Sequence, residues 1–573
     1  MKEILIINLT RMGDLLQTTP VMAGLKDECP GARITLVVNS QFAEICRGIP
    51  FIDELIVFEM KDLKIRLAGP RQSIAEGFRY LKRVINEINK KEYELAINFT
   101  HSSVSALLMS LVRAGEVRGY TVDSEGHKLI RHPWMRYFFN VVPNREYNPF
   151  HLVDMNLKSV GVTSQSQKLL YEIPEDAVAK VDDLLREEGV LENDMLVGIH
   201  LGASKGDKRW PSPSFALLAD MIVREFGAKI ILFGSPDEVG LSREFETAAG
   251  FEPLNFAGRT NLGELAALLR RCSLLISNDT GPLHLATAVG TTVIDIFTAN
   301  VHYLETGPYG KGHYVVQSDL PCVPCDFHVE CNNMICKDVI RAEAVFEAVL
   351  MATGRKPEKE ATAAVWKDAQ VYRTYFREDG LLGFLPLIQR HLKKDTVYRD
   401  LYREVWDRRP VISGKTDMVF ENMCTELSSS YLLDGIDDIV LSLRREAGEL
   451  EQIVNLAGEG FDLVSLIAGE ASGEQPDFGH IREIWKNVES VDAGIETIGY
   501  ANPCLRPLVL LFTYSKESLE GDGLLAQTEA ACGIYGDLHT AAEYMLGLIK
   551  KLVPFFESVS EGKMLREGAA HIS

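Results

Sequence analysis

The sequence predicts an α/β protein in which two doubly wound parallel sheets precede an all-α region. Apolar strand-like runs alternate with helical patterns up to about residue 165, and the same alternation restarts near Met195. From about Glu358 onward, helical periodicity dominates. Strands that are apolar along their whole length are typical of parallel sheets buried on both faces. We therefore expect three domains, at residues 1–170, 171–357 and 358–573.

Strand-like runs define the first two domains. In the first domain they lie at 3–9, 33–39, 54–60 and 94–99, with a helical pattern at 72–89. In the second they lie at 196–202, 229–235, 274–279 and 292–297, with helical patterns at 212–226, 238–249 and 262–271. The segment from Tyr171 is expected to link the two domains and to begin the second. Because doubly wound sheets bind ligands outside the carboxyl ends of their strands, one domain can hold a nucleotide and the other its reaction partner.

The composition is that of an ordinary globular protein, with 46% hydrophobic and 25% charged residues among 573. No apolar run approaches the roughly 18 residues of a membrane span, and the closest, Leu505–Tyr514, is short enough for a core element. The N-terminus begins as a strand and lacks the parts of a signal peptide. We therefore expect a cytoplasmic protein whose ten cysteines are mostly reduced.

The net charge of -21 is spread unevenly. Residues 411–573 contain 11 basic and 27 acidic residues, a net of -16, which leaves -5 for the first 410. No dominant basic face is available to neutralise phosphates, so nucleic acid is not an expected partner. The acidic helical region has no recognisable motif, and we expect it to bind a protein partner, to mediate oligomerisation or to cap the rest of the protein.

Residues 274–297 suggest an anion site. A buried strand ends at Ser277, and the cap-type residues Asn278, Asp279 and Thr280 precede a helix that opens with Gly281. Free backbone N–H groups and the helix dipole at such an end suit a diphosphate. A merely well-capped turn between strand and helix is the alternative explanation.

Two further strand ends add to this site. Residues 198–211 offer Ser204, Lys208 and neighbouring cations, which a leaving diphosphate needs, although a solvated surface pair is the alternative. Residues 233–238 close a third strand, where Glu238 or Asp237 could accept hydrogen bonds from a ribose. An acidic helix start explains these two carboxylates equally well.

Asp14 follows the first strand, directly after Gly13. A carboxylate at the edge of a cleft can take the proton of an attacking hydroxyl group. Gly13 would let the backbone turn closely there. From the local sequence, electrostatic stabilisation of the following helix by Asp14 is an equally good explanation.

Four stretches, "MGDLLQTTP", "SKGDKRWP", "GSPDE" and "SNDTGPLHLA", occur in this order. Together they resemble glycosyltransferase family 9, the ADP-heptose:lipopolysaccharide heptosyltransferases, over about residues 1–350. The resemblance implies a GT-B fold, in which two Rossmann-like domains face each other across a cleft. The first would bind the acceptor and the second the nucleotide sugar. The helical region departs from the family, whose members usually end near the second Rossmann-like domain.

The resemblance also implies roles for single residues. Asp14 would be the general base. On the donor side, Lys208 would contact the phosphates and Asp279 would orient the sugar. The other donor-binding candidates are Thr280 and Gly281 at the helix start, Ser204 near the diphosphate, and Glu238 at the ribose with Asp237 competing. His284 would be either a site residue or a packed one.

The function that follows is an inverting glycosyltransferase that moves a heptose or similar sugar from an ADP-sugar to a lipopolysaccharide core or related glycan. No pair of aspartates with DxD spacing stands out, so neither a metal nor a cofactor is expected. Two rivals remain open at this point. One is a glycosyltransferase that uses another nucleotide sugar, and the other is a non-catalytic nucleotide-sugar-binding scaffold with a helical interaction domain.

Basic residues among aromatic ones mark the acceptor domain. Residues 126–140 contain Arg131 within such a pattern, and residues 60–73 contain Lys64. Such stretches suit a membrane surface that carries an anionic, lipid-linked glycan, and a solvated basic edge is the alternative. We therefore expect Gly13, Lys64 and Arg131 on the acceptor side. The enzyme would then be peripheral on the inner face of the inner membrane.

Four cysteines lie close together in the sequence, at Cys322, Cys325, Cys331 and Cys336. Such a set could hold zinc or an iron–sulfur cluster. Paired C-x2-C motifs at a longer separation would be a stronger zinc signal, and we favour reduced or structural thiols.

Overall fold

The computed structural model describes residues 2–67, 71–326, 329, 331–361, 363–407, 416–473, 475–521 and 523–560. The chain divides into two compact units, which we call the α/β unit and the helical unit. The α/β unit comprises Met1–Glu125 and Phe150–Ile388, and the helical unit comprises Gly126–Pro149 and Gln389–Ser573. The second Rossmann-like domain and most of the first therefore belong to one unit.

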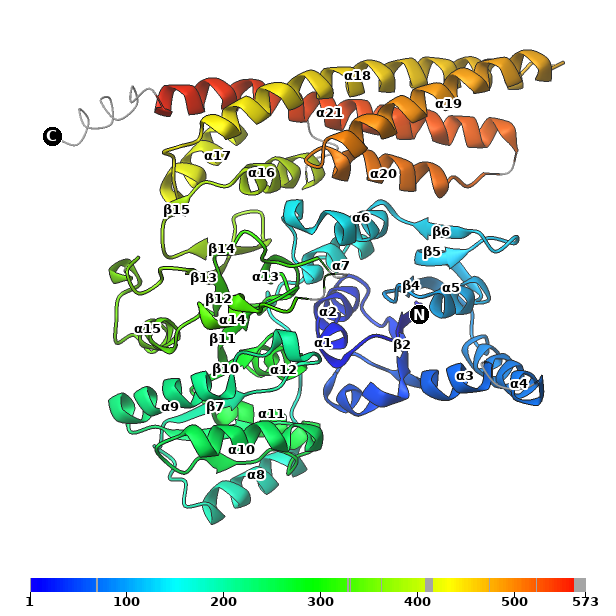
Figure 1. Ribbon diagram of the computed structural model, residues 1–573. Helices are drawn as coiled ribbons and strands as arrows, with labels where there is room; N and C mark the ends of the chain where they lie inside the picture. Colours follow the sequence, from blue (N-terminus) through cyan, green and yellow to red (C-terminus); the bar gives the residue numbers. More distant parts are fainter. Residues whose placement is uncertain are drawn as a thin grey trace. The chain divides into compact units, whose positions relative to one another are not determined.

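The first Rossmann-like domain has a parallel sheet in the order β3-β2-β1-β4-β5 (Figure 1). Ile4 to Ile7 of β1 are fully buried, as expected of a central strand covered on both faces. The elements are β1 Glu3–Asn8, α1 Met12–Leu16, α2 Thr19–Glu28, β2 Arg33–Asn39, η1 Ser40–Gly48, β3 Glu54–Phe58, α3 Met60–Leu67, α4 Arg71–Ile88, β4 Tyr93–Asn98, α5 Ser103–Ser110, β5 Ala114–Val122 and α7 Leu152–Val160.

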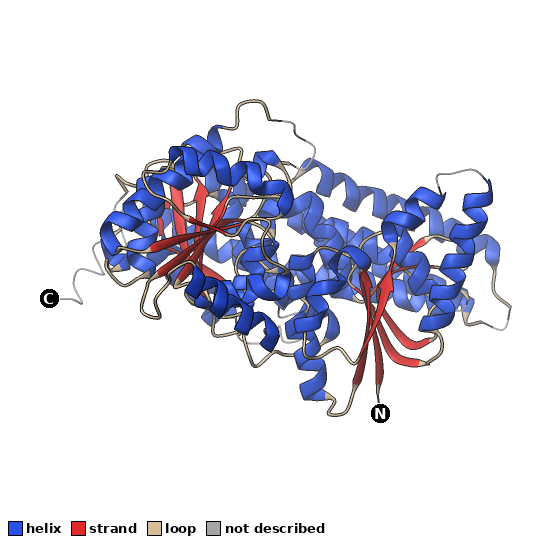
Figure 2. Ribbon diagram, turned by 90° about the horizontal axis from the view of Figure 1, so that it is seen from below, coloured by secondary structure: helices blue, strands red, loops and turns tan. Residues whose placement is uncertain are grey.

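The second Rossmann-like domain repeats this topology. Its strands have the order β9-β8-β7-β10-β11-β12 and are parallel. Figure 2 shows helices against both faces of each sheet. The elements are α8 Glu175–Glu187, β7 Leu196–His200, η3 Gly206–Lys208, α9 Ser212–Phe226, β8 Lys229–Phe233, η4 Pro236–Glu238, α10 Val239–Ala248, β9 Leu254–Asn255, α11 Leu262–Arg271, β10 Leu274–Asn278, α12 Gly281–Ala288, β11 Thr292–Phe297, α13 Tyr303–Thr306, β12 Tyr314–Ser318, α14 Ile335–Asp338 and α15 Ala342–Ala352.

The strand order reverses at one place in each sheet, between β1 and β4 and between β7 and β10. Doubly wound sheets bind ligands outside the carboxyl ends of the strands at such a reversal, because the following helices depart to opposite faces. The residues after β1, β7 and β10 are therefore well placed for a site, and they include Asp14, Lys208 and Asp279.

The expected boundary at residue 358 is wrong. Residues 358–388 form η5 (Glu358–Glu360) and two strands, β13 (Ala369–Phe376) and β14 (Leu382–Pro386). These strands extend the second sheet, because β13 pairs antiparallel with β12 and β14 pairs antiparallel with β13. Buried Trp366 joins the core of this domain. The helical unit therefore begins after Ile388, and it takes residues 126–149 from the predicted first domain.

The helical unit is dominated by long helices, of which α18 and α21 lie side by side (Figure 1). Buried Leu450, Ile453, Ala457 and Val464 of α18 recur at the three- and four-residue spacing of one helix face. The elements are β6 Lys128–Arg131, α6 Pro133–Val141, η2 Val142–Tyr147, β15 Arg390–His391, α16 Lys394–Asp407, α17 Thr416–Ser430, β16 Tyr431–Leu432, α18 Asp437–Ala471, α19 Phe478–Ala501, α20 Arg506–Glu517 and α21 Leu524–Ser560.

The apolar run at 505–514 lies almost wholly in α20, with Leu508, Val509, Leu511 and Phe512 buried. It is thus a core element, as expected. Among the described residues, no helix is long and apolar enough to cross a membrane.

Candidate active site

Asp14 lies in the first turn of α1, which begins four residues after β1 ends. Its Oδ2 accepts a hydrogen bond of 3.2 Å from the backbone N–H of Arg11, so the carboxylate does cap this helix. The side chain is half-buried. Burial raises the pKa of Asp14 above its usual value, against the opposing effects of Arg11, Thr10 and Lys208. Capping occupies one side of the carboxylate, and the raised pKa makes it a stronger base than an exposed aspartate.

Asp279 lies between the end of β10 and the start of α12. Burial raises the pKa of its carboxyl group to about 6, the charge of Lys208 opposes this shift, and the charge of Asp14 adds to it. The two carboxylates and the ammonium group are therefore close enough for their charges to act on one another. The structure brings together three residues that the sequence placed at the ends of three different strands.

Two glycines allow α1 and α12 to approach closely (Figure 1). A Cβ atom at Gly13 would lie 2.6 Å from Cδ2 of His284, and one at Gly281 would lie 2.4 Å from Cε of Met12. Real Cβ atoms do not tolerate such distances. Gly13 was expected to permit a tight turn, but it lies within α1 and what it permits is contact with the second domain.

His284 is buried in this contact. Its Nε2 lies 3.1 Å from Nε2 of Gln17 and 4.0 Å from Oδ1 of Asp279. Burial lowers the pKa of His284 to about 4, so the ring is neutral at neutral pH. His284 was expected to be either a site residue or a packed one. The structure shows a packed residue whose ring lies near the predicted site residue Asp279.

Glu238 lies at the end of η4, and its carboxylate lies against Gly202 in the loop that follows β7. The nearest oxygen of its carboxylate would be only 1.7 Å from a Cβ atom at Gly202, so a side chain there would displace the carboxylate from this position. Burial alone would raise the pKa of Glu238, but hydrogen bonds and charge from His200, with hydrogen bonds from Ser235, lower it to about 2. Asp237 is exposed. An ionised, partly buried acceptor is the better candidate for ribose hydroxyls, which favours Glu238 over Asp237.

His200 is a residue that sequence reasoning missed. It ends β7 and is only 4% exposed. Its Nδ1 lies 3.3 Å from Oγ1 of Thr280, and its Nε2 lies 3.6 Å from Oε2 of Glu238. His200 therefore links the predicted phosphate-binding and ribose-binding residues. A histidine at the end of an otherwise apolar strand was the signal that could have found it.

Asn278 has a similar linking role. Its Oδ1 accepts from the backbone N–H of Trp210 at 2.9 Å, and its Nδ2 donates to the carbonyl groups of Leu201 and Gly202 at 3.0 and 3.1 Å. The sequence suggested a helix cap, but the side chain fixes the loop that holds Lys208. Ser204 is exposed in the same loop, so its contact with a diphosphate stays a prediction.

The acceptor-side candidate Arg131 is paired within the helical unit. Arg131 belongs to β6 of the helical unit, and its guanidinium Nε donates to both carboxylate oxygens of Glu520, at 3.0 and 2.9 Å. Nearby Lys128 lies 4.5 Å from the ring centre of Phe139 and 4.9 Å from that of Tyr514. This basic and aromatic stretch therefore packs within its own unit. The side chain of Lys64 lies outside the described residues.

The cysteines at 322–336 have free thiols. The backbone N–H of Cys325 donates to the carbonyl of Ala299 at 3.0 Å, and that of Met334 donates to Sγ of Cys331 at 3.3 Å. In the part of the chain that the structure describes, no group of three or more His, Cys, Asp or Glu side chains is arranged to hold a metal ion.

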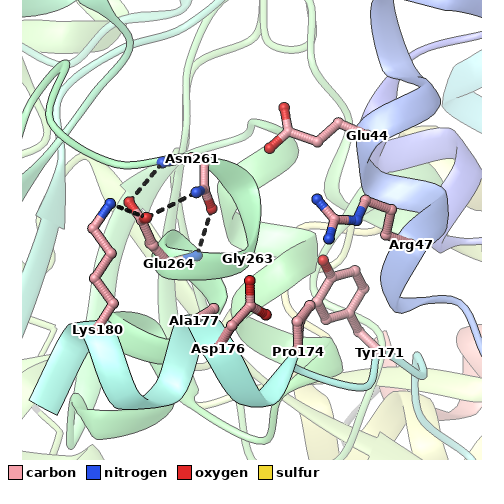
Figure 3. Close-up of a pocket in the computed structure, with 10 residues that line it drawn as sticks. All are labelled: Glu44, Arg47, Tyr171, Pro174, Asp176, Ala177, Lys180, Asn261, Gly263 and Glu264. Atoms are coloured by element: carbon pink, nitrogen blue, oxygen red, sulfur yellow. Dashed lines mark hydrogen bonds and ion pairs between the residues drawn. The ribbon is translucent and has the colours of Figure 1, made fainter.

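A separate pocket of about 60 Å³ lies where η1, the linker and α11 meet (Figure 3). Figure 3 shows the ion pair between Lys180 and Glu264 on one side and Arg47 and Tyr171 on the other. Oε1 of Glu44 accepts from the backbone N–H of Leu262 at 3.2 Å. None of the predicted site residues lines this pocket. It is a second contact between the two Rossmann-like domains, separate from the candidate residues after β1, β7 and β10.

Comparison with known proteins agrees with this geometry. The family model for glycosyltransferase family 9 (heptosyltransferase) matches residues 81–335. Lipopolysaccharide heptosyltransferase 3 of Escherichia coli K12 is 30% identical over 297 residues, which cover 51% of this chain and 80% of that protein. Lipopolysaccharide heptosyltransferase 1 of Campylobacter coli is 27% identical over 315 residues, which cover 52% of this chain and 85% of that protein.

Among solved structures, the family 9 glycosyl transferase of Veillonella parvula DSM 2008 is similar, with 26% identity and a TM-score of 0.51. The match covers 62% of this chain and 98% of that one. These likenesses agree with the two Rossmann-like sheets. The chain belongs to glycosyltransferase family 9, the heptosyltransferase family of lipopolysaccharide core biosynthesis, and has a GT-B fold.

Proposed function

We propose that this protein transfers a heptose from ADP-heptose to a lipopolysaccharide core or related glycan, with inversion at the anomeric carbon. The observation that carries the proposal is the convergence of Asp14, Lys208 and Asp279 after β1, β7 and β10. The names of the relatives, lipopolysaccharide heptosyltransferases, support the sugar and the acceptor. A lipid-linked acceptor would be met at the inner face of the inner membrane.

On the donor side, each group supplies a different contact. Lys208 would neutralise the diphosphate, and the backbone N–H groups at the start of α12 would bind its oxygens. Glu238, ionised at any physiological pH, would accept hydrogen bonds from the ribose hydroxyls. Asp279 would orient the sugar against the acceptor. Lys208 and these N–H groups would also stabilise the negative charge that develops on the leaving diphosphate.

On the acceptor side, Asp14 would take the proton of the attacking hydroxyl. The acceptor oxygen would form a bond to the anomeric carbon while the bond from that carbon to the diphosphate breaks. ADP would leave with the bonding electrons. One displacement from the face opposite the leaving group inverts the configuration, and the raised pKa of Asp14 suits a base that must accept a proton in this step.

Donor identity is tested by calorimetric titration with ADP, GDP, UDP and CMP. We expect ADP to bind most tightly. Inversion is tested by comparing the anomeric configuration of donor and product by NMR. Tighter binding of another nucleotide would favour a different sugar donor, retention would exclude single displacement, and binding without any turnover would favour the scaffold.

A further inference from the structure

The outward face of α19 carries a stripe of exposed aromatic side chains. Phe478 is 65% exposed, Trp485 39% and Tyr500 68%. With about 3.6 residues per turn, the three lie within roughly 60° of one another around the helix. The opposite face is buried in the helical unit through Ile481, Ile484, Val488, Val491, Ile495 and Ile498. The three aromatic residues are seven and fifteen residues apart, and exposed charged residues such as Arg482 and Glu489 lie between them on the same face.

The stripe is complementary to itself. Counting outward from Glu489, Arg482 and Glu496 lie at equal distances on its two sides. Phe478 and Tyr500 also lie at equal distances from it. If two α19 helices run antiparallel with Glu489 on a twofold axis, each residue of such a pair meets its counterpart on the other copy. Cation then faces anion, and one aromatic ring faces another.

A third pair fits the same axis. Trp485 and Ala493 lie four residues to either side of Glu489, and both are exposed. A large side chain on one copy would therefore pack over a small one on the other, as close packing of two helices requires. Positions 4, 7 and 11 residues from Glu489 lie within about 40° of it around the helix, so the members of each pair lie on the contact face. All three pairs thus follow from one placement.

The charged groups are available for such a contact. Arg482 is exposed and makes no ion pair with any residue that the structure describes. Glu496 is half-buried, and among the described residues its Oε1 accepts from the Thr513 hydroxyl at 3.3 Å. The two Glu489 carboxylates would repel each other at the axis. Lys486, one helical turn away, is exposed and would reduce this repulsion.

We propose that the protein forms a homodimer through antiparallel packing of α19 against α19 of a second copy. An isologous interface of this kind needs one self-complementary patch and closes at two copies. The paired residues extend over a helix length of about 33 Å. This assigns the acidic helical unit a role in assembly, and the assignment is independent of the reaction at the α/β unit.

The test is the mass of the full chain in solution, measured by sedimentation equilibrium over a range of concentrations. We expect a species of twice the 63.9 kDa chain mass. Arg482→Glu would face Glu496 and should weaken the dimer at least tenfold, since like charges opposed across an interface are strongly unfavourable. Glu496→Arg should do the same. The double variant Arg482→Glu, Glu496→Arg restores opposite charges and should regain the wild-type affinity within about threefold.

Two controls keep the test sharp. Glu483→Arg changes the charge as Glu496→Arg does, but it lies about 120° away from the axis around the helix and should leave the dimer intact. Glu489→Gln removes the repulsion at the axis and should tighten the dimer. Circular dichroism confirms that each variant keeps its helices. A wild-type chain that stays monomeric, or a dimer that survives both single charge reversals, would overturn the proposal.

Discussion

Buried carboxylates have more hydrogen-bond donors around them in the helical unit than at the carboxyl ends of the strands in the α/β unit. Glu446 of α18 is only 1% exposed and is surrounded by donors. Its carboxylate accepts from Lys394 at 2.9 Å, from the Tyr398 hydroxyl at 2.6 Å, and from Ser442 and Arg445 at 3.0 Å. Burial alone would raise the pKa of Glu446, but these partners lower it.

Among the described residues, Asp14 and Asp279 have fewer donors. Asp14 accepts from the Arg11 backbone and the Thr10 side chain, and Asp279 from the Thr306 side chain. Burial raises the pKa of both, although the charges of Lys208 and Arg11 oppose this shift. A charge that the chain satisfies fully stabilises the fold, whereas a charge that it leaves partly unsatisfied is held at a cost. A partly unsatisfied charge is therefore available to bind a ligand. The following variants should distinguish such ligand-binding charges from structural ones.

The largest effect is expected for Asp14→Asn, which keeps the size of the side chain but removes the base. Turnover should fall by about 10²–10⁴-fold, as is typical of a positioned general base. ADP affinity should barely change, because Lys208 and the start of α12 would hold the diphosphate. Asp27→Asn, at an exposed position of α2, is the matched control for steady-state kinetics. Turnover within threefold of wild type would leave Asp14 with only its capping role.

Glu446→Ala should give the next largest effect, on stability alone. It leaves the fully buried Tyr398 hydroxyl without its acceptor and removes the charge opposite Lys394. The expected loss is roughly 2–4 kcal/mol. Calorimetry should show a lower melting temperature with donor affinity unchanged. Glu459 is exposed on the same helix, and Glu459→Ala should leave the melting temperature nearly unchanged. An unchanged melting temperature would remove the distinction between the two regions.

Lys208→Ala tests the donor side. A charge-assisted phosphate contact contributes on the order of 1.5–3 kcal/mol, so ADP affinity should fall roughly ten- to hundredfold. Lys205, exposed in the same loop, is the control, and its change to alanine should alter affinity by less than about threefold. Equal losses for the two lysines would point to a general charge effect in place of a specific contact.

The sequence predicted the parts of this fold that are set locally. Apolar strands and cap residues lie within a few positions of one another, so the two sheets and the segment Asn278–Gly281 were found. The strands β5, β9, β12, β13 and β14 were missed, because their sequences are less uniformly apolar than those of the central strands. Contacts such as Gly13 with His284 and His200 with Thr280 join distant segments, and no local pattern encodes them.

The smallest effect is expected for Asp279→Asn. This variant should stabilise the fold, whereas Glu446→Ala should destabilise it. The pKa of Asp279 is raised to about 6, above the usual 3.8. As pH falls from 7 towards 4, the folded chain therefore binds a proton before the unfolded chain does, and Asp279 makes the fold more stable relative to neutral pH. At pH 7.5, its ionised form destabilises the fold. Asp279→Asn should therefore raise the melting temperature at pH 7.5.

The expected gain is about 1–3 kcal/mol, from roughly 1.4 kcal/mol for each pKa unit. The gain over wild type should shrink as pH falls towards 5, while turnover should be lower at every pH because the donor sugar loses its anchor. Asp237→Asn, which is exposed, should show neither change. Calorimetry at several pH values checks both signs. A destabilised Asp279→Asn chain would mean that this carboxylate is satisfied within the fold, as Glu446 is, and would place it among the structural charges.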